Sequence, residues 1–186
     1  MSVVARTSSG STAEGDPADH FRLFMSSWFT GVAIVTSVDA DDRPHGLTCT
    51  SLASVALDPP TLLVCLQVGS GTLGAIQERR AFVVNLLHSS GQAAAERFAS
   101  PEPDRFSHVR WRPAPLTGLP WFAHDAVAMA ECRVADSAIV GDHVIICGTV
   151  ENVVADGGRP LLYGSRTFHT PCLPHRHDIC PKEAVT

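Results

Sequence analysis

The chain has 186 residues, of which 45% are hydrophobic and 18% are charged, and its formal net charge is −5. A chain this apolar and this weakly charged is not intrinsically disordered, and its length is typical of one domain with a buried core. The negative charge argues against nucleic-acid or anionic-membrane partners. No apolar run approaches the roughly 20 residues that span a bilayer.

The N-terminal residues and the cysteines indicate the compartment. The first residues lack the apolar stretch of a secretory signal. We therefore expect a cytoplasmic protein whose six cysteines are reduced thiols. No C-x-x-C pair is present, which argues against a redox dithiol or a zinc ribbon.

Composition divides the chain into a disordered leader over 1–15, one domain over 16–170 and an irregular tail over 171–186. The domain opens with an N-cap, Asp16, and a proline at the first helical position. A helix should follow as far as Gly31, and we expect its apolar stripe to pack in the core. The stripe consists of Phe21, Phe24, Met25, Trp28 and Phe29.

The rest of the domain predicts seven strands and two helices. The strands are expected over 32–38, 46–55, 61–67, 81–87, 126–135, 144–154 and 161–163, and the helices over 73–79 and 91–98. Residues 100–125 predict a long packed surface loop. Because strands mostly follow one another, we predict a mainly β fold, an antiparallel barrel with flanking helices, rather than a doubly wound sheet.

Two segments could line a ligand site. Residues 46–51 place two threonines and one serine in a strand, where hydroxyls and N–H groups suit the edge of a flat heteroaromatic ring, although such residues also occur in ordinary strands. The run Gly69-Ser70-Gly71-Thr72 before a helix could cradle a phosphate, or could simply cap the helix.

Three further features have a functional and a purely structural interpretation. Arg97-Phe98 could pair with a phosphate and stack on a ring, or be a surface arginine beside a core phenylalanine. Gly141-Asp142-His143 could donate hydrogen bonds at a strand mouth, or form a hairpin turn. Cys172, His175, His177 and Cys180 match no common zinc spacing, so we expect no metal site there.

Eight segments, taken together in their order along the chain, resemble a known family, whereas no single motif does so alone. They read TGVAIVT, PHGLTCTSLASVALDPPTLLVCL, SGTLGAI, FVVNLL, ERF, PDRF, GDHVIICGTVE and PLLYGSRTF. On these segments the chain from Phe21 to Phe168 resembles the flavin reductase-like family. The resemblance implies a split antiparallel β-barrel, the FMN-binding split barrel, that forms a homodimer, binds FMN or FAD, and oxidises NADH or NADPH.

The resemblance also assigns residues to each ligand. The flavin contacts are Pro44, His45, Gly46, Leu47 and Thr48 at the ring, Thr50 and Ser51 at the ring edge or ribityl chain, Cys65, Leu66 and Gln67 beside the ribityl chain and phosphate, Ser70 and Thr72 at the phosphate, and Arg97 with Phe98 closing over it. His143, the catalytic candidate, would lie near the nicotinamide, and Tyr163, Gly164, Ser165 and Arg166 would help to hold the pyridine nucleotide. Position 71, often larger or basic in relatives, is glycine.

The implied reaction is hydride transfer from nicotinamide to flavin, with the reduced flavin passing to a separate flavin-dependent monooxygenase. Two alternatives stay open: a flavoprotein that acts directly on an organic substrate, and a non-catalytic module that binds flavin or haem. A zinc-dependent regulator built on the tail is a third. The aromatic helix, with Trp111 and Trp121, has more apolar surface than a small barrel covers, which agrees with a homodimer.

Overall fold

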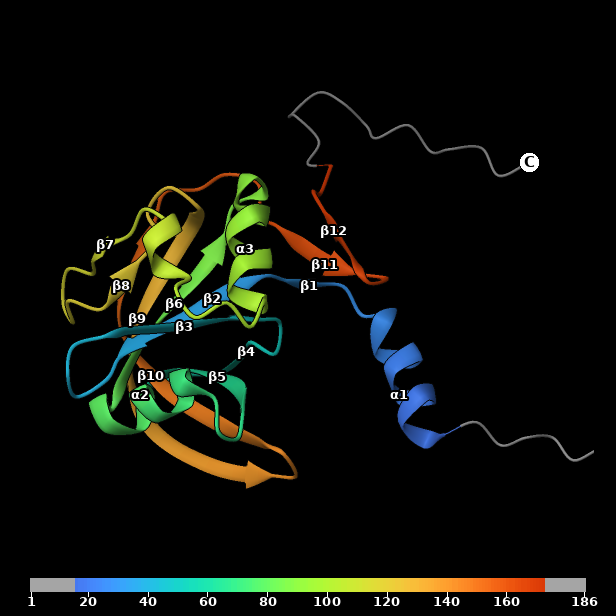
Figure 1. Cartoon of the computed structure of the whole chain (residues 1–186), viewed down its shortest axis with the longest axis horizontal. Coiled ribbons are helices and arrows are strands. Elements are labelled where there is room, and N and C mark those ends of the chain that lie inside the picture. The colour runs from blue at the N-terminus through green and yellow to red at the C-terminus, as the bar shows by residue number, and fades with distance from the viewer. Residues whose placement is uncertain (1–15, 173–186) are drawn as a thin grey trace, which may run out of the picture.

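A seven-stranded antiparallel sheet forms the body of the computed structural model, which describes residues 16–172 (Figure 1). Its strand order is β3-β2-β6-β9-β10-β5-β4. The strands are β2 (Ala33–Val38), β3 (Pro44–Cys49), β4 (Ala53–Leu57), β5 (Pro60–Gln67), β6 (Ala81–Leu87), β9 (Ala126–Val140) and β10 (His143–Ala155). All neighbouring pairs run antiparallel, which confirms the mainly β fold predicted from the sequence.

The two edge strands of the sheet follow one another in the chain, and the segment that joins them is bonded to β5. β3 and β4 stand at opposite ends of the strand order and are joined by residues 50–52. The Ser51 hydroxyl accepts a hydrogen bond from the Cys65 N–H and donates one to the Cys65 carbonyl, each at 3.1 Å. Ser51 therefore fastens the end of β3 to β5. The enclosed core includes Val35, Val64, Leu66, Phe82 and Ile146.

The predicted single strand over 46–55 is wrong. β3 ends at Cys49 and β4 begins at Ala53, because the chain crosses here from one edge of the sheet to the other. Threonine and serine are common in strands, so the composition of residues 50–52 does not mark the crossing.

Two helices pack against β3. α2 (Gly71–Arg79) buries Leu73 and Ile76 in the main core, and its N-cap is the Ser70 hydroxyl, which accepts from the Leu73 N–H at 3.2 Å. α3 (Gln92–Ala99) follows a short 3-10 helix, η1 (Ser89–Gly91), and buries Phe98 in a second apolar cluster. Both helices match the segments predicted for them.

The segment 100–125 contributes more to the core than a surface loop would. It contains η2 (Phe106–His108), and β7 (Arg112–Pro113) paired with β8 (Pro120–Trp121). Leu119, Trp121 and Phe122 are buried, and the Phe122 N–H donates to the buried Asn85 side chain at 2.9 Å. Trp121 therefore adds no exposed apolar surface, contrary to the expectation from the sequence.

A third, small sheet lies where the N-terminal and C-terminal segments of the described chain meet. Its order is β1-β11-β12, from β1 (Thr30–Gly31), β11 (Leu162–Gly164) and β12 (Thr167–His169). The sequence predicted part of β11, but neither β1 nor β12, since both are too short to show a period.

α1 (Pro17–Ser26) stands away from the barrel (Figure 1). Its start is as predicted, since the Asp16 side chain accepts from the Ala18 N–H at 3.0 Å, but it ends at Ser26 and not at Gly31. The expected packing of its stripe in the core is wrong: no α1 residue is buried, and Phe24 and Trp28 are 72% and 66% exposed. Helical spacing defines an apolar face without defining what covers it.

None of the helices in residues 16–172 is both long enough and apolar enough to cross a membrane.

Candidate functional site

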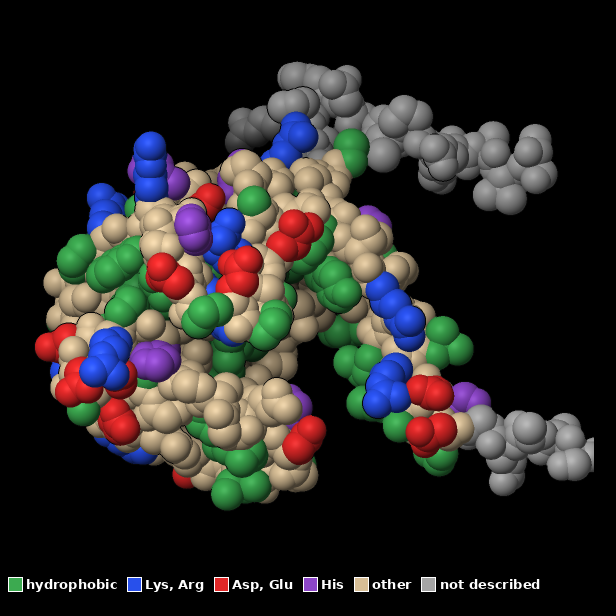
Figure 2. Space-filling view, viewed as in Figure 1, with side chains coloured by type: hydrophobic (Ala, Val, Ile, Leu, Met, Phe, Trp, Pro, Cys, Tyr) green, Lys and Arg blue, Asp and Glu red, His purple; other side chains and the backbone are tan. Residues whose placement is uncertain are grey.

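A large hollow of about 810 Å³ separates α1 from the barrel. Figure 2 shows hydrophobic side chains along α1 on the side that faces this gap. The barrel contributes Thr50 and Ser51 from the crossing between β3 and β4, and Tyr163, Gly164 and Arg166 come from the small sheet. The structure thus brings together residues that the sequence assigned separately to the flavin and to the pyridine nucleotide.

A second hollow of about 410 Å³ adjoins the first, because Thr50 and Tyr163 line both. Thr48 also lines it, and the Thr48 hydroxyl donates to the Ala95 carbonyl of α3 at 2.6 Å. That bond ties β3 to α3 and leaves the threonine oxygen as an acceptor. Ser165 closes the region toward α1, since its N–H donates to the Ser26 carbonyl at 2.6 Å.

A third hollow of about 210 Å³ lies at the other end of β3. Pro44, His45 and Gly46 line it together with Gly71 and Thr72 at the start of α2. A β-carbon at Gly46 would lie 2.9 Å from the Phe98 ring, so the close approach of that ring requires glycine here. Leu47, the remaining predicted ring contact on β3, packs partly buried against the main core.

The predicted phosphate loop contains two backbone N–H groups that could donate to an anion. The N–H groups of Gly71 and Thr72 form no hydrogen bond within residues 16–172, as is usual in the first turn of a helix. Such groups favour an anion. The Ser70 oxygen is engaged in the cap, and Thr72 is buried.

His143 lies apart from the three hollows, at the first position of β10. It is paired in register with Gln67 of β5, and its Nδ1 lies 2.8 Å from the Asp142 carboxylate. The hydrogen bond from His143 lowers the pKa of Asp142.

Cys65 is half-buried and Leu66 is 1% exposed, so a ligand would meet the backbone of Leu66 rather than its side chain.

Arg97 and Phe98, at the end of α3, both have partners within the chain. Arg97 Nη1 lies 3.1 Å from a Glu102 oxygen. The Phe98 ring is 1% exposed and meets Phe106 edge-on, with ring centroids 4.9 Å apart. Phe98 therefore shapes the site from the core.

The sequence missed several residues that line the hollows. Phe21, Met25 and Trp28 line the largest, because their stripe was assigned to the core. Arg105 lines the smallest and donates to the Gly46 carbonyl at 2.9 Å. Only its place in the segment PDRF could have indicated it.

Within residues 16–172 no cluster of three or more His, Cys, Asp or Glu side chains is placed to hold a metal ion. Cys172 is exposed, and the other members of the His/Cys tail, His175, His177 and Cys180, lie outside the described residues.

Comparison with known proteins gives one consistent result. The family model described as Flavin reductase like domain matches residues 25–171. The curated flavin reductase (NADPH) of Lentzea aerocolonigenes is 55% identical over 151 residues, which cover 81% of this chain and 88% of the relative. The reductase subunit HsaB of a flavin-dependent monooxygenase from Mycobacterium tuberculosis is 37% identical over 155 residues, which cover 82% of this chain and 81% of the relative.

A solved structure extends the comparison to bound ligands. The NADH:FAD oxidoreductase SgcE6 of Streptomyces globisporus C-1027, in complex with NAD and FAD fragments, has a TM-score of 0.78 with this chain at 29% identity. The match covers 88% of this chain and 98% of that one. The similarity therefore extends over the whole barrel.

Proposed function

The chain belongs to the flavin reductase like domain family, and on that premise we propose that it is an NAD(P)H-dependent flavin reductase. It transfers a hydride from NADH or NADPH to FMN or FAD and supplies the reduced flavin to a separate monooxygenase. One observation carries the proposal: a single edge strand, β3, joins a wide apolar hollow at one end to a helix start with free N–H groups at the other.

The residues around β3 fit a flavin. The ring would lie along β3, where aromatic side chains such as Tyr163 and the hydroxyls of Thr50 and Ser51 offer both an apolar wall and polar partners for the ring edge. The phosphate would lie at the first turn of α2, where it could accept from the N–H groups of Gly71 and Thr72. Ser70, Arg97 and Phe98 would shape this end.

When bound, the flavin supplies the ring that accepts the hydride. The chain's own task is to hold two flat rings in contact and to keep water out. Asp142 can only accept a hydrogen bond when ionised, so it fixes the His143 proton on Nδ1 and leaves Nε2 as an acceptor in the neutral ring. We propose that Nε2 orients the carboxamide of the nicotinamide, while residues 163–166 contact another part of the dinucleotide.

The flavin should be held loosely, because a reductase that serves a second enzyme must release its product. The name of the HsaB relative, a reductase subunit of a flavin-dependent monooxygenase, supports this arrangement. We also propose a homodimer, in which a second copy covers the exposed stripe of α1 and completes the largest hollow.

A steady-state assay tests the proposed activity. NADH or NADPH oxidation is followed with increasing FMN, FAD or riboflavin, and the rate should rise with free flavin and saturate. The same series shows which nicotinamide and which flavin the protein prefers. A yellow protein that does not oxidise NADH or NADPH would instead support the binding module or the enzyme with its own organic substrate.

The cytoplasmic location stays a proposal. Cys49, Cys65, Cys132, Cys147 and Cys172 are all free in the described chain, which agrees with a reducing compartment. Fractionation of cells that express the full chain tests it.

A further inference from the structure

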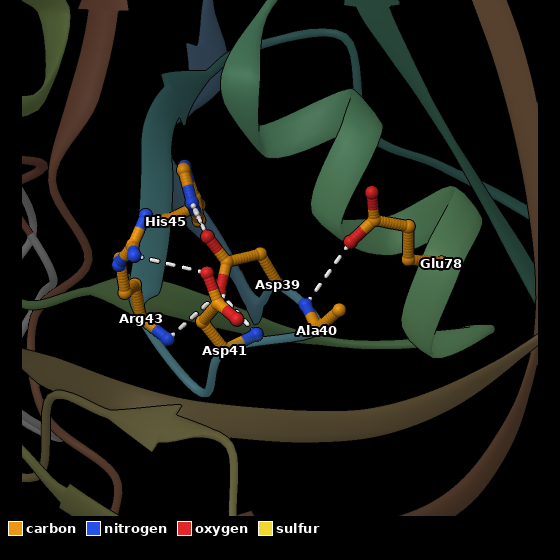
Figure 3. A network of polar contacts seen from close by, with 6 residues as sticks. All are labelled: Asp39, Ala40, Asp41, Arg43, His45 and Glu78. Carbon is orange, nitrogen blue, oxygen red and sulfur yellow. Dashed lines mark hydrogen bonds and ion pairs between the residues drawn. The ribbon is translucent and has the colours of Figure 1, made fainter.

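The turn between β2 and β3 contains a carboxylate, Asp39, whose two oxygens are both fixed by contacts within the turn and with β3 (Figure 3). Its Oδ1 accepts from the N–H groups of Asp41 and Arg43, at 3.0 and 2.9 Å. Its Oδ2 lies 3.0 Å from Nε2 of His45. The hydrogen bonds from His45 and from the Arg43 backbone lower the pKa of Asp39, so the carboxylate is ionised and His45 must donate from Nε2.

The same turn is attached to the last turn of α2. The Ala40 N–H donates to a Glu78 oxygen at 3.0 Å, as Figure 3 shows, and Arg79 Nη2 lies 3.6 Å from an Asp42 oxygen. The position of Asp39 is therefore fixed relative to α2.

His45 stands beside the first turn of that helix. A β-carbon at Gly71 would lie 3.0 Å from Nδ1 of His45, so the imidazole occupies the space that a side chain at position 71 would need. Nδ1 has no hydrogen-bond partner among residues 16–172. The ring lines the smallest hollow together with Thr72 and Arg105.

The other charged groups around this hollow are largely paired. Arg105 donates to the carbonyls of Gly46 and Phe98, and Glu102 pairs with Arg97. In the turn, Arg43 pairs with Asp41 at 2.9 Å. Asp39 is thus the carboxylate in direct contact with His45.

We propose that Asp39 is a positioning residue: it fixes the His45 ring through Nε2, so that Nδ1 lies beside the first turn of α2 and, when it carries a proton, donates to the 5′-phosphate of the flavin. The inference rests on the proposed function, and it assigns His45 to the phosphate rather than to the ring contacts that the resemblance implies.

Riboflavin, which lacks the phosphate, separates this role from a merely structural one. Dissociation constants for riboflavin, FMN and FAD are measured by flavin fluorescence. Asp39→Asn keeps the size of the side chain and an acceptor for the turn, but removes the charge. It should weaken FMN and FAD binding about tenfold, as expected for a charge-assisted hydrogen bond, and change riboflavin binding less than about twofold.

Two further variants and one control sharpen the test. His45→Gln and Gly71→Ala should produce the same loss confined to the phosphate-bearing flavins, the first by removing the imidazole ring and the second by displacing it. Asp41→Asn, which alters an exposed carboxylate in the same turn, should bind all three flavins like the wild type. An equal loss for riboflavin in Asp39→Asn, or no loss for FMN, would overturn the proposal.

The two proposals fail in different ways. If NADH and NADPH reduce none of the three flavins, the proposed reductase activity is wrong, and the binding constants still decide the role of Asp39. If turnover with riboflavin is normal and phosphate selectivity is unaltered in the variants, only the inference about Asp39 and His45 is wrong.

Discussion

The proposed role of the His143 side chain can be tested by a single substitution, because the partner that orients its ring is defined. Replacement by alanine removes the ring that Asp142 orients. We expect the KM for NADH or NADPH to rise about tenfold, the loss typical of one hydrogen bond to a polar group, while the dissociation constant of the flavin changes less than about twofold.

The matched control is His124→Ala, which removes a histidine from a different surface hollow and should leave both constants unchanged. If His143→Ala abolishes flavin binding and leaves the KM for the nicotinamide intact, the assigned role is wrong.

Single residues differ in how far the sequence predicts them. The caps Asp16 and Ser70 were predictable because the bonded partner lies two or three positions away. The contact of Arg105 with Gly46 spans 59 positions, so no local pattern contains it. Asp39 and His45 are only six apart, yet their contact depends on the shape of the turn between them.

At the scale of elements, β9 contains a fully buried carboxylate. Glu131 accepts hydrogen bonds from the N–H groups of Leu116 and Thr117, from the Thr117 hydroxyl at 2.7 Å, and from the Asn152 amide at 2.8 Å. It thereby ties the segment between β7 and β8 to the barrel. Burial raises the pKa of Glu131, but the hydrogen bonds outweigh it and the pKa is lowered overall.

Because the folded-state pKa is lowered, Glu131 stabilises the fold above its unfolded-state value of about 4.3, and this stability is lost as pH falls through the folded-state value. Glu131→Gln places amide N–H groups against backbone N–H donors. It should lower the free energy of unfolding at pH 7 by about 2–4 kcal/mol, and the variant should lose less stability than the wild type on acidification.

Urea unfolding at pH 7 and in acid measures both effects. Glu151→Gln is the control, since Glu151 forms an exposed pair with Arg133, which should contribute less than about 1 kcal/mol. Equal losses in the two variants would contradict the tie made by Glu131.

At the scale of the whole molecule, the fold class was easier to predict from the sequence than individual contacts were. Strands that follow one another favoured an antiparallel barrel, and most of the predicted strands are present. The sequence could not predict how α1 lies, because an apolar stripe packs equally well on its own barrel or on another chain.

The proposed homodimer makes a prediction at this scale. Phe24→Ser removes an exposed ring from α1, so it should weaken the dimer without lowering the stability of the monomer. Light scattering after gel filtration should show a shift from dimer to monomer. Leu116→Ser, which alters an exposed leucine in the distant segment between β7 and β8, is the control. A monomeric wild type would refute the dimer.

Ser51 has two roles: its hydroxyl forms hydrogen bonds with the backbone of Cys65 in β5, and the residue lines the largest of the three hollows. When this hollow is re-engineered to bind a different heterocycle, substitutions at Thr50 and at Ser51 therefore have different consequences for the fold. Libraries that randomise Thr50 vary the lining alone, whereas those that randomise Ser51 also remove the hydrogen bonds to Cys65, and most of their members should unfold at a lower urea concentration.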